Sequence, residues 1–198
     1  MTFSMNMERR TISLICSQKL RGGYEGKPSI FDDMTSDDII FAFFPCTRFE
    51  DQILISFRGQ ARQQEKHSDI QKLEYDLKLH RELSENYNTI TKLAIIAIKR
   101  GLRVVFENPY STQHYLTRYW CLKPSLIDKN RRERGDYFGK PTQYWFIGTE
   151  PEQNLIWEVM DYVEYKTVKD TEKGKKRSEI HPQYARRFIR EFILEAEQ

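Results

Sequence analysis

The chain has few cysteines, and their spacing suggests no structural use for them. There are three, widely separated, with no CxxC motif and no Cys/His cluster. This spacing excludes a disulfide framework and a zinc motif, so we expect free thiols and no metal site. Cys16 and Cys121 are interpreted as structural, whereas Cys46 has a more unusual position.

Long apolar runs are also missing. No run approaches the ~20 residues that cross a bilayer, and residues 1–16 lack the apolar segment and cleavage site of a signal peptide. We therefore predict a cytoplasmic protein that does not contact a membrane. There is no internal repeat, and 198 residues suit a single domain.

Positive charge is only slightly in excess, but it is unevenly distributed. The net charge is +3, yet residues 111–140 and residues 170–190 each contain seven Lys/Arg and three acids. These two surpluses favour contacts with phosphate, and so a nucleic-acid partner, DNA rather than RNA. Ordinary solvated loops would give the same pattern.

The hydrophobic pattern of the first half predicts an α/β fold. Residues 11–15 and 38–44 are typical of strands, residues 68–101 of one long helix, and residues 102–109 of another buried strand. The apolar positions that indicate the start of the helix are Ile70, Leu73, Leu77, Leu79 and Leu83. Strand, helix and strand form a βαβ unit, so we expect a Rossmann-like, mostly parallel sheet with flanking helices.

The second half is expected to complete this single domain. A short helix is predicted within residues 110–120, and strands at 142–148 and 157–165. A final helix after His181 should pack on the sheet through one apolar face, formed by Tyr184, Phe188, Ile189, Phe192 and Ile193. The chain thus divides into an atypical start (1–23), a βαβ core (24–109) and a basic loop with the last strands and helix (110–198).

Two predicted parallel strands end in polar motifs, "PC" at 45–46 and "ENP" at 107–109. The carboxyl ends of the strands line the ligand crevice of open α/β sheets, so Cys46 and Glu107 could converge on one ligand. A cysteine at such a position, followed by free backbone N–H groups, can have a lowered pKa and act as a nucleophile.

The sequence "FFPCT" followed by "VVFENP" resembles the catalytic pair of the cytosine-5 DNA methyltransferases. Together with "GDYFGKPTQYWFIG" and "RSEIHPQYARRFIREFI", it looks like small, divergent methyltransferase-like proteins of phages and mobile elements. The resemblance runs from about residue 24 to the end. It implies a methyltransferase-like fold that acts on flipped pyrimidines with S-adenosylmethionine.

The resemblance also implies roles for individual residues. Cys46 would add to C6 of the base and Glu107 would hold its N3 and exocyclic amine. The candidates for shaping the site or binding the substrate are Pro45, Thr47, Asn108, Pro109, Arg118, Arg131, Arg132, Arg134 and Gln143.

The chain departs from that family in several places. Gly22, Gly23 and Gly26 form no convincing cofactor motif, so no cofactor-binding residue is assigned. "PCT" replaces the usual "PCQ", and "ENP" the usual "ENV". A non-catalytic nucleic-acid-binding or regulatory relative therefore remains an alternative. So does a half-enzyme that is completed by another chain or a second copy.

Simpler interpretations stay open for single residues. Cys46 could be a small apolar side chain at a strand end, and Glu107 could cap a turn. "TQYW" is interpreted as core and sheet edge, with base stacking by its aromatic rings as the alternative. His114 and His181 are expected at the surface.

Overall fold

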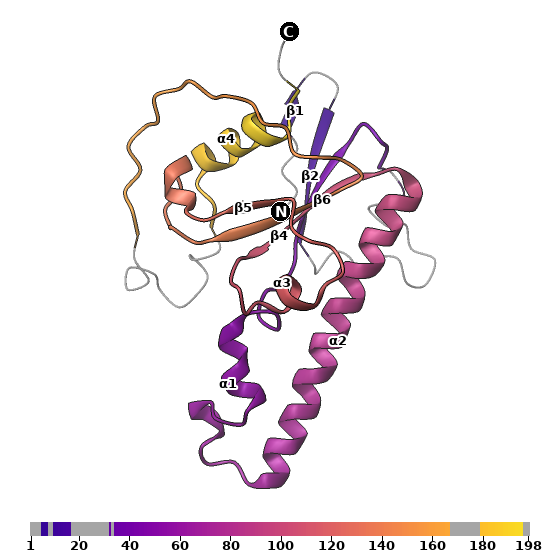
Figure 1. Ribbon diagram of the computed structural model, residues 1–198, viewed down its shortest axis with the longest axis vertical. Coiled ribbons are helices and arrows are strands. Elements are labelled where there is room, and N and C mark those ends of the chain that lie inside the picture. The colour runs from indigo at the N-terminus through magenta and orange to yellow at the C-terminus, as the bar shows by residue number, and fades with distance from the viewer. Residues whose placement is uncertain (1–4, 8–9, 17–31, 33, 167–178, 196–198) are drawn as a thin grey trace.

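The computed structural model describes residues 5–7, 10–16, 32, 34–166 and 179–195. The described strands form one sheet in the order β1-β2-β3-β4-β6-β5, with helices on both of its faces (Figure 1). The strands are β1 Met5–Met7, β2 Arg10–Cys16, β3 Ile39–Phe43, β4 Arg103–Pro109, β5 Leu126–Asp128 and β6 Thr142–Ile147. The helices are α1 Leu54–Phe57, α2 Asp69–Arg100, α3 Tyr115–Tyr119 and α4 Pro182–Phe192, with single 3₁₀ turns at η2 Asp51–Ile53, η3 Arg62–Gln64 and η4 Arg131–Arg134.

The predicted βαβ unit is confirmed, but the sheet is mixed rather than mostly parallel. Strands β2, β3 and β4 run parallel, with α2 connecting β3 to β4. The remaining neighbours, β1 with β2, β4 with β6 and β6 with β5, are antiparallel. The described elements between β4 and β6 are the five-residue α3, the short β5 and the single turn η4, and none of them is a helix long enough for the usual crossover to a parallel neighbour.

The local sequence sets both ends of α2. At the start, the Ser68 and Gln71 side chains reciprocally accept the N–H groups of Gln71 and Ser68, which forms a capping box. At the end, Gly101 adopts φ 63°, a left-handed conformation that costs glycine little. The predicted helix is therefore confirmed to within a residue at each end.

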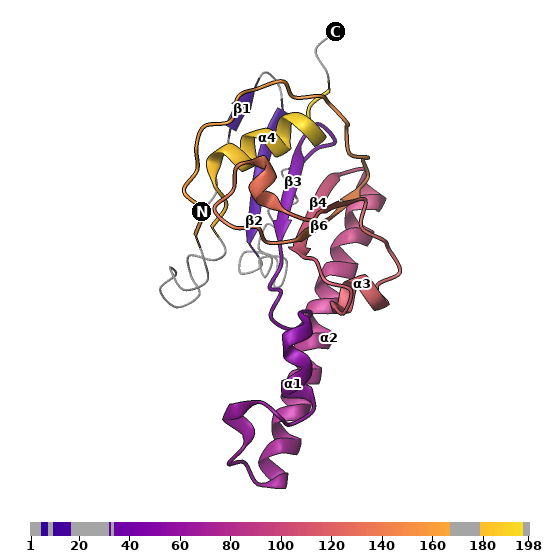
Figure 2. The same cartoon turned by 60° about the vertical axis from the view of Figure 1, so that its left-hand side comes forward.

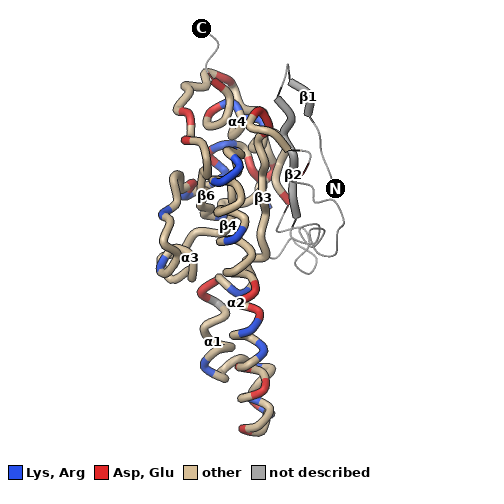
Figure 3. The backbone as a smooth tube through the Cα atoms, turned by 90° about the vertical axis from the view of Figure 1, so that its right-hand side faces the viewer, with Lys and Arg blue, Asp and Glu red and all other residues tan. Residues whose placement is uncertain are grey.

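The first half of α2 projects from the sheet together with α1 (Figures 1 and 2). The Phe57 ring of α1 packs on His80 of α2 at 4.9 Å between centroids. In this projecting arm Ile70, Leu73 and Leu77, which indicated the helix, are exposed. Charges of both signs alternate along the arm (Figure 3).

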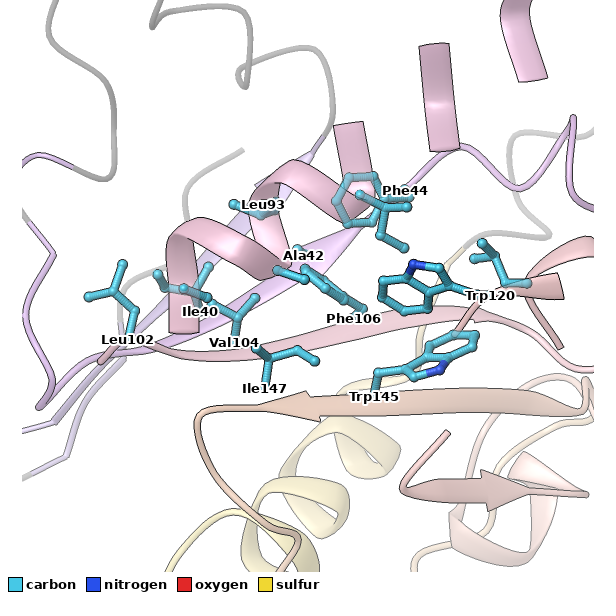
Figure 4. Close-up of a cluster of buried hydrophobic side chains, with 14 of the residues drawn as sticks. Ile40, Ala42, Phe44, Leu93, Leu102, Val104, Phe106, Trp120, Trp145 and Ile147 are labelled. Carbon is cyan, nitrogen blue, oxygen red and sulfur yellow. The ribbon is translucent and has the colours of Figure 1, made fainter. Parts of the chain in front are cut away.

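Each face of the sheet has its own core. On one face, Val104 and Phe106 of β4 pack under the second half of α2 with Trp120 and Trp145 (Figure 4). On the other face, Val105 packs with residues of α4, including Tyr184, Phe188 and Phe192. The packing of the last helix on the sheet is thus confirmed. Because side chains alternate along a strand, Glu107 shares the α4 face with Val105.

Residues 157–165 do not form the predicted strand. The segment 151–166 crosses α4 as an irregular strap, with Trp157 90% and Val159 99% exposed (Figure 1). Two of its hydrogen bonds go to the end of α4, where the carbonyls of Phe192 and Glu191 accept from the N–H groups of Glu152 and Asn154 at 2.9 and 3.0 Å. Because these N–H groups bond to helix carbonyls, this part of the strap joins no sheet ladder.

Among the described residues, no helix combines the length and apolar character needed to cross a bilayer.

Candidate active site at the ends of two parallel strands

The two polar motifs meet at one end of the sheet. Phe43, the last residue of β3, is the register partner of Glu107 on β4, and Pro45 and Cys46 follow just beyond β3. After Cys46 the chain turns, and the N–H groups of Phe49 and Glu50 donate to the Cys46 carbonyl at 2.8 and 3.0 Å. The tertiary structure therefore brings together two motifs 61 residues apart (107 − 46).

The loops behind the motifs are fixed to each other. Tyr115 N–H, at the start of α3, donates to the Phe49 carbonyl at 2.7 Å, and the two rings stack at 5.9 Å. Phe49 is buried. On the other side Arg48 forms an ion pair with Glu82 of α2. These contacts hold the Cys46 turn against both α2 and α3.

Cys46 is half-buried, and its thiol is neutral at physiological pH. Burial, a hydrogen bond to Glu50 and the charges of Glu50 and Glu107 raise the pKa of the thiol to about 12, although Lys140 opposes them. The sequence-based expectation of a lowered pKa has the wrong sign. The two N–H groups that could have stabilised a thiolate donate to the Cys46 carbonyl instead.

Glu107 is almost fully buried, and its carboxyl group forms no hydrogen bond or ion pair with the described residues. Burial raises its pKa, while the charges of Lys140 and Arg131 lower it. A neutral carboxyl group donates one hydrogen bond and accepts others. Such a group complements a ring nitrogen that lies next to an amine.

Lys140 is a residue of the site that sequence reasoning counted only as part of a basic loop. It lies just before β6, where Tyr110 N–H donates to the Pro141 carbonyl at 2.9 Å and Thr142 pairs with Pro109. Its charge acts on Cys46, Glu107 and His114, and its amine forms no ion pair within the described part of the chain. The one feature of the sequence that could have indicated a role for Lys140 in the site is its position directly before the "PTQYWF" strand.

The three arginines of the basic loop form contacts with other segments of the fold. Arg131 is buried, pairs with Asp136 and lies 4.8 Å from the Tyr184 ring centroid. Arg134 binds Glu191 at 3.0 and 3.1 Å and Asp128 at 3.2 Å. Arg132 donates to the Lys166 carbonyl at 3.2 Å. Of the three, only Arg131 is placed where its charge reaches Glu107.

The remaining substrate-binding candidates differ in exposure. Thr47 is exposed, Pro45 and Pro109 are half-buried, and Arg118 donates to Gln113 on the outer side of α3. Asn108 is buried and donates to the Glu107 carbonyl at 2.7 Å, within the last residues of β4.

Gln143 is fully buried, as are Tyr144 and Trp145, so the interpretation of this segment as core is confirmed. The Gln143 amide accepts from Thr117 at 2.9 Å and donates to the Pro109 carbonyl at 2.8 Å. Both ends of the amide therefore have protein partners, and Gln143 ties β6 to the end of β4.

The two histidines are not surface residues, contrary to expectation. His114 is 1% exposed and packs on Phe49, and burial lowers its pKa to about 4. Gln143 contacts its Nδ1 at 3.3 Å, whereas its Nε2 has no partner within the described structure. The partly buried His181 caps α4, because its Nδ1 accepts from Gln183 N–H at 3.1 Å.

The described residues do not supply a recognisable S-adenosylmethionine site. The glycines at 22, 23 and 26 lie outside them. A hollow of about 280 Å³ lies between α4 and the strap, but its lining, which includes Glu158, Arg187 and Arg190, shares no residue with the strand ends. No group of His, Cys, Asp and Glu side chains suited to a metal occurs within the described ranges.

Comparisons of the chain with protein-family models, with curated proteins and with solved structures found no match. The function is therefore inferred from the geometry of the strand ends.

Proposed function

We propose that this protein is a pyrimidine C5-modifying enzyme of the cytosine-5 methyltransferase type, with a Rossmann-like methyltransferase fold, that acts on DNA. One observation carries the proposal. Glu107 presents a nearly buried carboxyl group near the end of β4 that has no hydrogen-bond partner among the described residues, and the neighbouring parallel strand leads into Cys46. A buried polar group without a partner is costly, so a ligand that satisfies it gains affinity and specificity.

The chemistry follows from the properties of the two groups. The target base must leave its stack, because C5 and C6 of a paired pyrimidine cannot be reached. The Cys46 sulfur adds to C6, and neutral Glu107 donates to N3 and accepts from the exocyclic amine. The electrons displaced by the addition are drawn toward N3 and make C5 nucleophilic.

Lys140 supports the same step electrostatically. Its positive charge acts on both Cys46 and Glu107, so it favours the thiolate character that develops on sulfur during attack and departure. In a site partly shielded from water, such a charge is worth more than it would be in solvent.

S-adenosylmethionine, the proposed donor, would supply an electrophilic methyl group. Because the glycines at 22, 23 and 26 lie outside the described residues, donor binding is tested separately. We expect calorimetric titration with S-adenosylmethionine and with S-adenosylhomocysteine to give micromolar binding, roughly −8 kcal/mol. Absence of binding in both titrations would favour a non-catalytic relative or a half-enzyme.

The thiol step can be tested without any donor. Addition of sulfur to C6 lets C5 exchange its hydrogen with water. We expect the chain to release tritium from random-sequence duplex DNA labelled at C5 of cytosine, and Cys46→Ala to release none. A Cys46→Ala protein that released tritium at the wild-type rate would contradict the proposal.

The raised pKa of Cys46 favours a second candidate, a nucleic-acid-binding relative without catalysis. Such a protein would bind the same DNA but release no tritium. The third candidate is a half-enzyme, which would exchange or bind donor only with a second chain. Light scattering of the active sample tests this third candidate, because an active protein that is strictly monomeric cannot be a half-enzyme.

A further inference from the structure

The strap leaves a row of large apolar side chains uncovered. Leu155, Trp157 and Val159 are 81%, 90% and 99% exposed, and Tyr162 follows at 88%. A single exposed apolar side chain is ordinary, but a contiguous group of this size on a folded chain marks an interaction site. The row is therefore a candidate surface for a partner.

The side chains of the strap alternate between α4 and solvent. Ile156 is half-buried and Glu158 pairs with Arg190 of α4, whereas Trp157 between them and Val159 after them are exposed. A period of two is the pattern of an extended chain with one covered face. This part of the strap thus has the side-chain pattern of a strand, although it belongs to no sheet.

The backbone of the same segment is unpaired. Within the described part of the chain, the N–H groups of residues 155–160 donate no hydrogen bond. The segment is anchored at both ends, because Asn154 N–H donates to the Glu191 carbonyl at 3.0 Å and Asp161 N–H to the Gln183 side chain at 3.2 Å. Unpaired backbone groups in an anchored, strand-like segment are a template for the addition of another strand.

The charge of the strap indicates which strand would pair with it. Residues 150–165 contain five acids and no Lys/Arg. Glu158 is paired with Arg190, and Arg186 and Arg187 of α4, which line the hollow between helix and strap, offset part of the remaining charge. A second copy would bring the same acids and a nucleic acid would bring phosphates, so like charges disfavour both. A segment rich in Lys/Arg is favoured instead.

We propose that the strap binds an extended, Lys/Arg-rich segment of a partner protein, which adds to residues 155–160 as a β-strand. Its backbone pairs with the N–H and C=O groups of these residues. Its apolar side chains, at alternate positions, pack on Trp157 and Val159, and its cations lie near Asp161 and Glu164. The strap shares no residue with the strand ends of the candidate active site, so this inference does not rest on the proposed function.

The test is hydrogen exchange of the full chain, because exchange reports whether a backbone N–H group becomes hydrogen-bonded. The probe is a ten-residue peptide of alternating valine and lysine. A peptide of alternating valine and glutamate reverses the charge, and a peptide of alternating serine and lysine keeps the charge but lacks apolar side chains. Acrylamide quenching of tryptophan fluorescence follows the same titrations, since Trp120 and Trp145 are buried and Trp157 is exposed.

We expect the valine–lysine peptide to slow exchange at residues 155–160, and both control peptides to leave it unchanged. Trp157→Ser, at an exposed position that folding does not need, should weaken binding by at least about tenfold. The double variant Asp161→Asn, Glu164→Gln should weaken it several-fold. Leu73→Ser, which removes an exposed apolar side chain from α2, is the matched control and should bind as wild type does.

Three outcomes overturn the proposal. If the valine–lysine peptide leaves exchange at residues 155–160 unchanged, the strap does not accept a strand. If single-stranded DNA protects these N–H groups and the peptide does not, the partner is a nucleic acid. If the protein alone is a dimer in light scattering and the same groups are already protected, a second copy covers the strap. Tritium release is measured separately, so each of these results leaves the proposed function where its own test puts it.

Discussion

Glu107 lies directly opposite Phe43 across the parallel β3–β4 pair, at the point where β3 ends and two residues before the end of β4. This register places a buried carboxyl group beside the turn that carries Cys46, and the charge of Glu107 acts on that thiol. Within the described part of the chain, neither group forms an ion pair that would hold it ionised. The site thus combines a thiol and a carboxyl group, both with raised pKa values, near one lysine.

Replacement of Glu107 by glutamine should lower the activity of the protein without lowering its stability. Glu107→Gln keeps the shape and can still donate and accept one hydrogen bond each, but its amide cannot pass a proton to N3. We therefore expect tritium release to fall by about 10²-fold. Glu107→Asp, with its carboxyl group displaced by one methylene, serves as the positional control. Unchanged release in Glu107→Gln would contradict a role in holding the base.

The same substitution predicts a pH-dependent gain in stability. The pKa of Glu107 is raised in the folded chain, so the folded state holds more protons than the unfolded state above about pH 4, the ordinary range of a carboxyl group. Wild type therefore loses stability as the pH rises through this window. In urea unfolding we expect the free energy of unfolding of Glu107→Gln to rise relative to that of wild type as the pH increases from 4 to 8. A difference between the two proteins that did not change with pH would contradict a pKa of Glu107 raised by burial.

His114 should make the fold sensitive to acid. Its pKa is lowered from 6.5 to about 4 in the folded chain, so the unfolded state binds the extra proton between these values and stability falls as the pH decreases. The contribution is at most on the order of 3 kcal/mol. In urea unfolding, His114→Gln should lose less free energy of unfolding between pH 7 and pH 4.5 than wild type does.

The matched control for this pH effect is His80→Gln. The side chain of His80 is 62% exposed on α2, next to Asp76. Its replacement should leave the acid-induced loss of stability close to that of wild type. If His114→Gln and His80→Gln lost the same free energy of unfolding on acidification, the acid sensitivity would have a source other than His114.

Tryptophan substitutions should distinguish the strap from the core. Trp145 is 1% exposed, so Trp145→Ala should lose about 3–5 kcal/mol in the free energy of unfolding. Trp157 is 90% exposed, so Trp157→Ala should change it by less than about 0.5 kcal/mol. A large loss for Trp157→Ala would mean that the strap packs more closely than described.

Cysteine reactivity offers a further direct test of the site. At pH 8 we expect iodoacetamide to modify the exposed Cys121 much faster than Cys46, since the pKa of Cys46 is about 12. Lys140→Met should widen this difference because it removes the charge that favours the thiolate. Faster modification of Cys46 than of Cys121 would contradict the neutral thiol.

Local sequence signals predicted the elements that depend on local physics. Ser68, Gln71 and Gly101 fix the limits of α2, and the apolar runs mark β3, β4 and β6. The strand direction of β6 was not predictable from its own residues, because hydrophobicity does not distinguish a parallel from an antiparallel neighbour. The strap was mistaken for a strand because Trp157, Val159 and Tyr162 have high strand propensity, although all three are exposed.

The sequence by itself determined that this chain forms an α/β fold with Cys46 and Glu107 at strand ends, because hydrophobic periodicity and helix caps act over a few residues. Only the tertiary structure decided how these groups behave. Burial and the charges of Glu50, Glu107 and Lys140 set the pKa of Cys46. The ion pairs of Arg131 with Asp136 and of Arg134 with Asp128 hold these arginines within the fold. Desolvation and charge act through space, so they depend on which distant segments the sheet brings together.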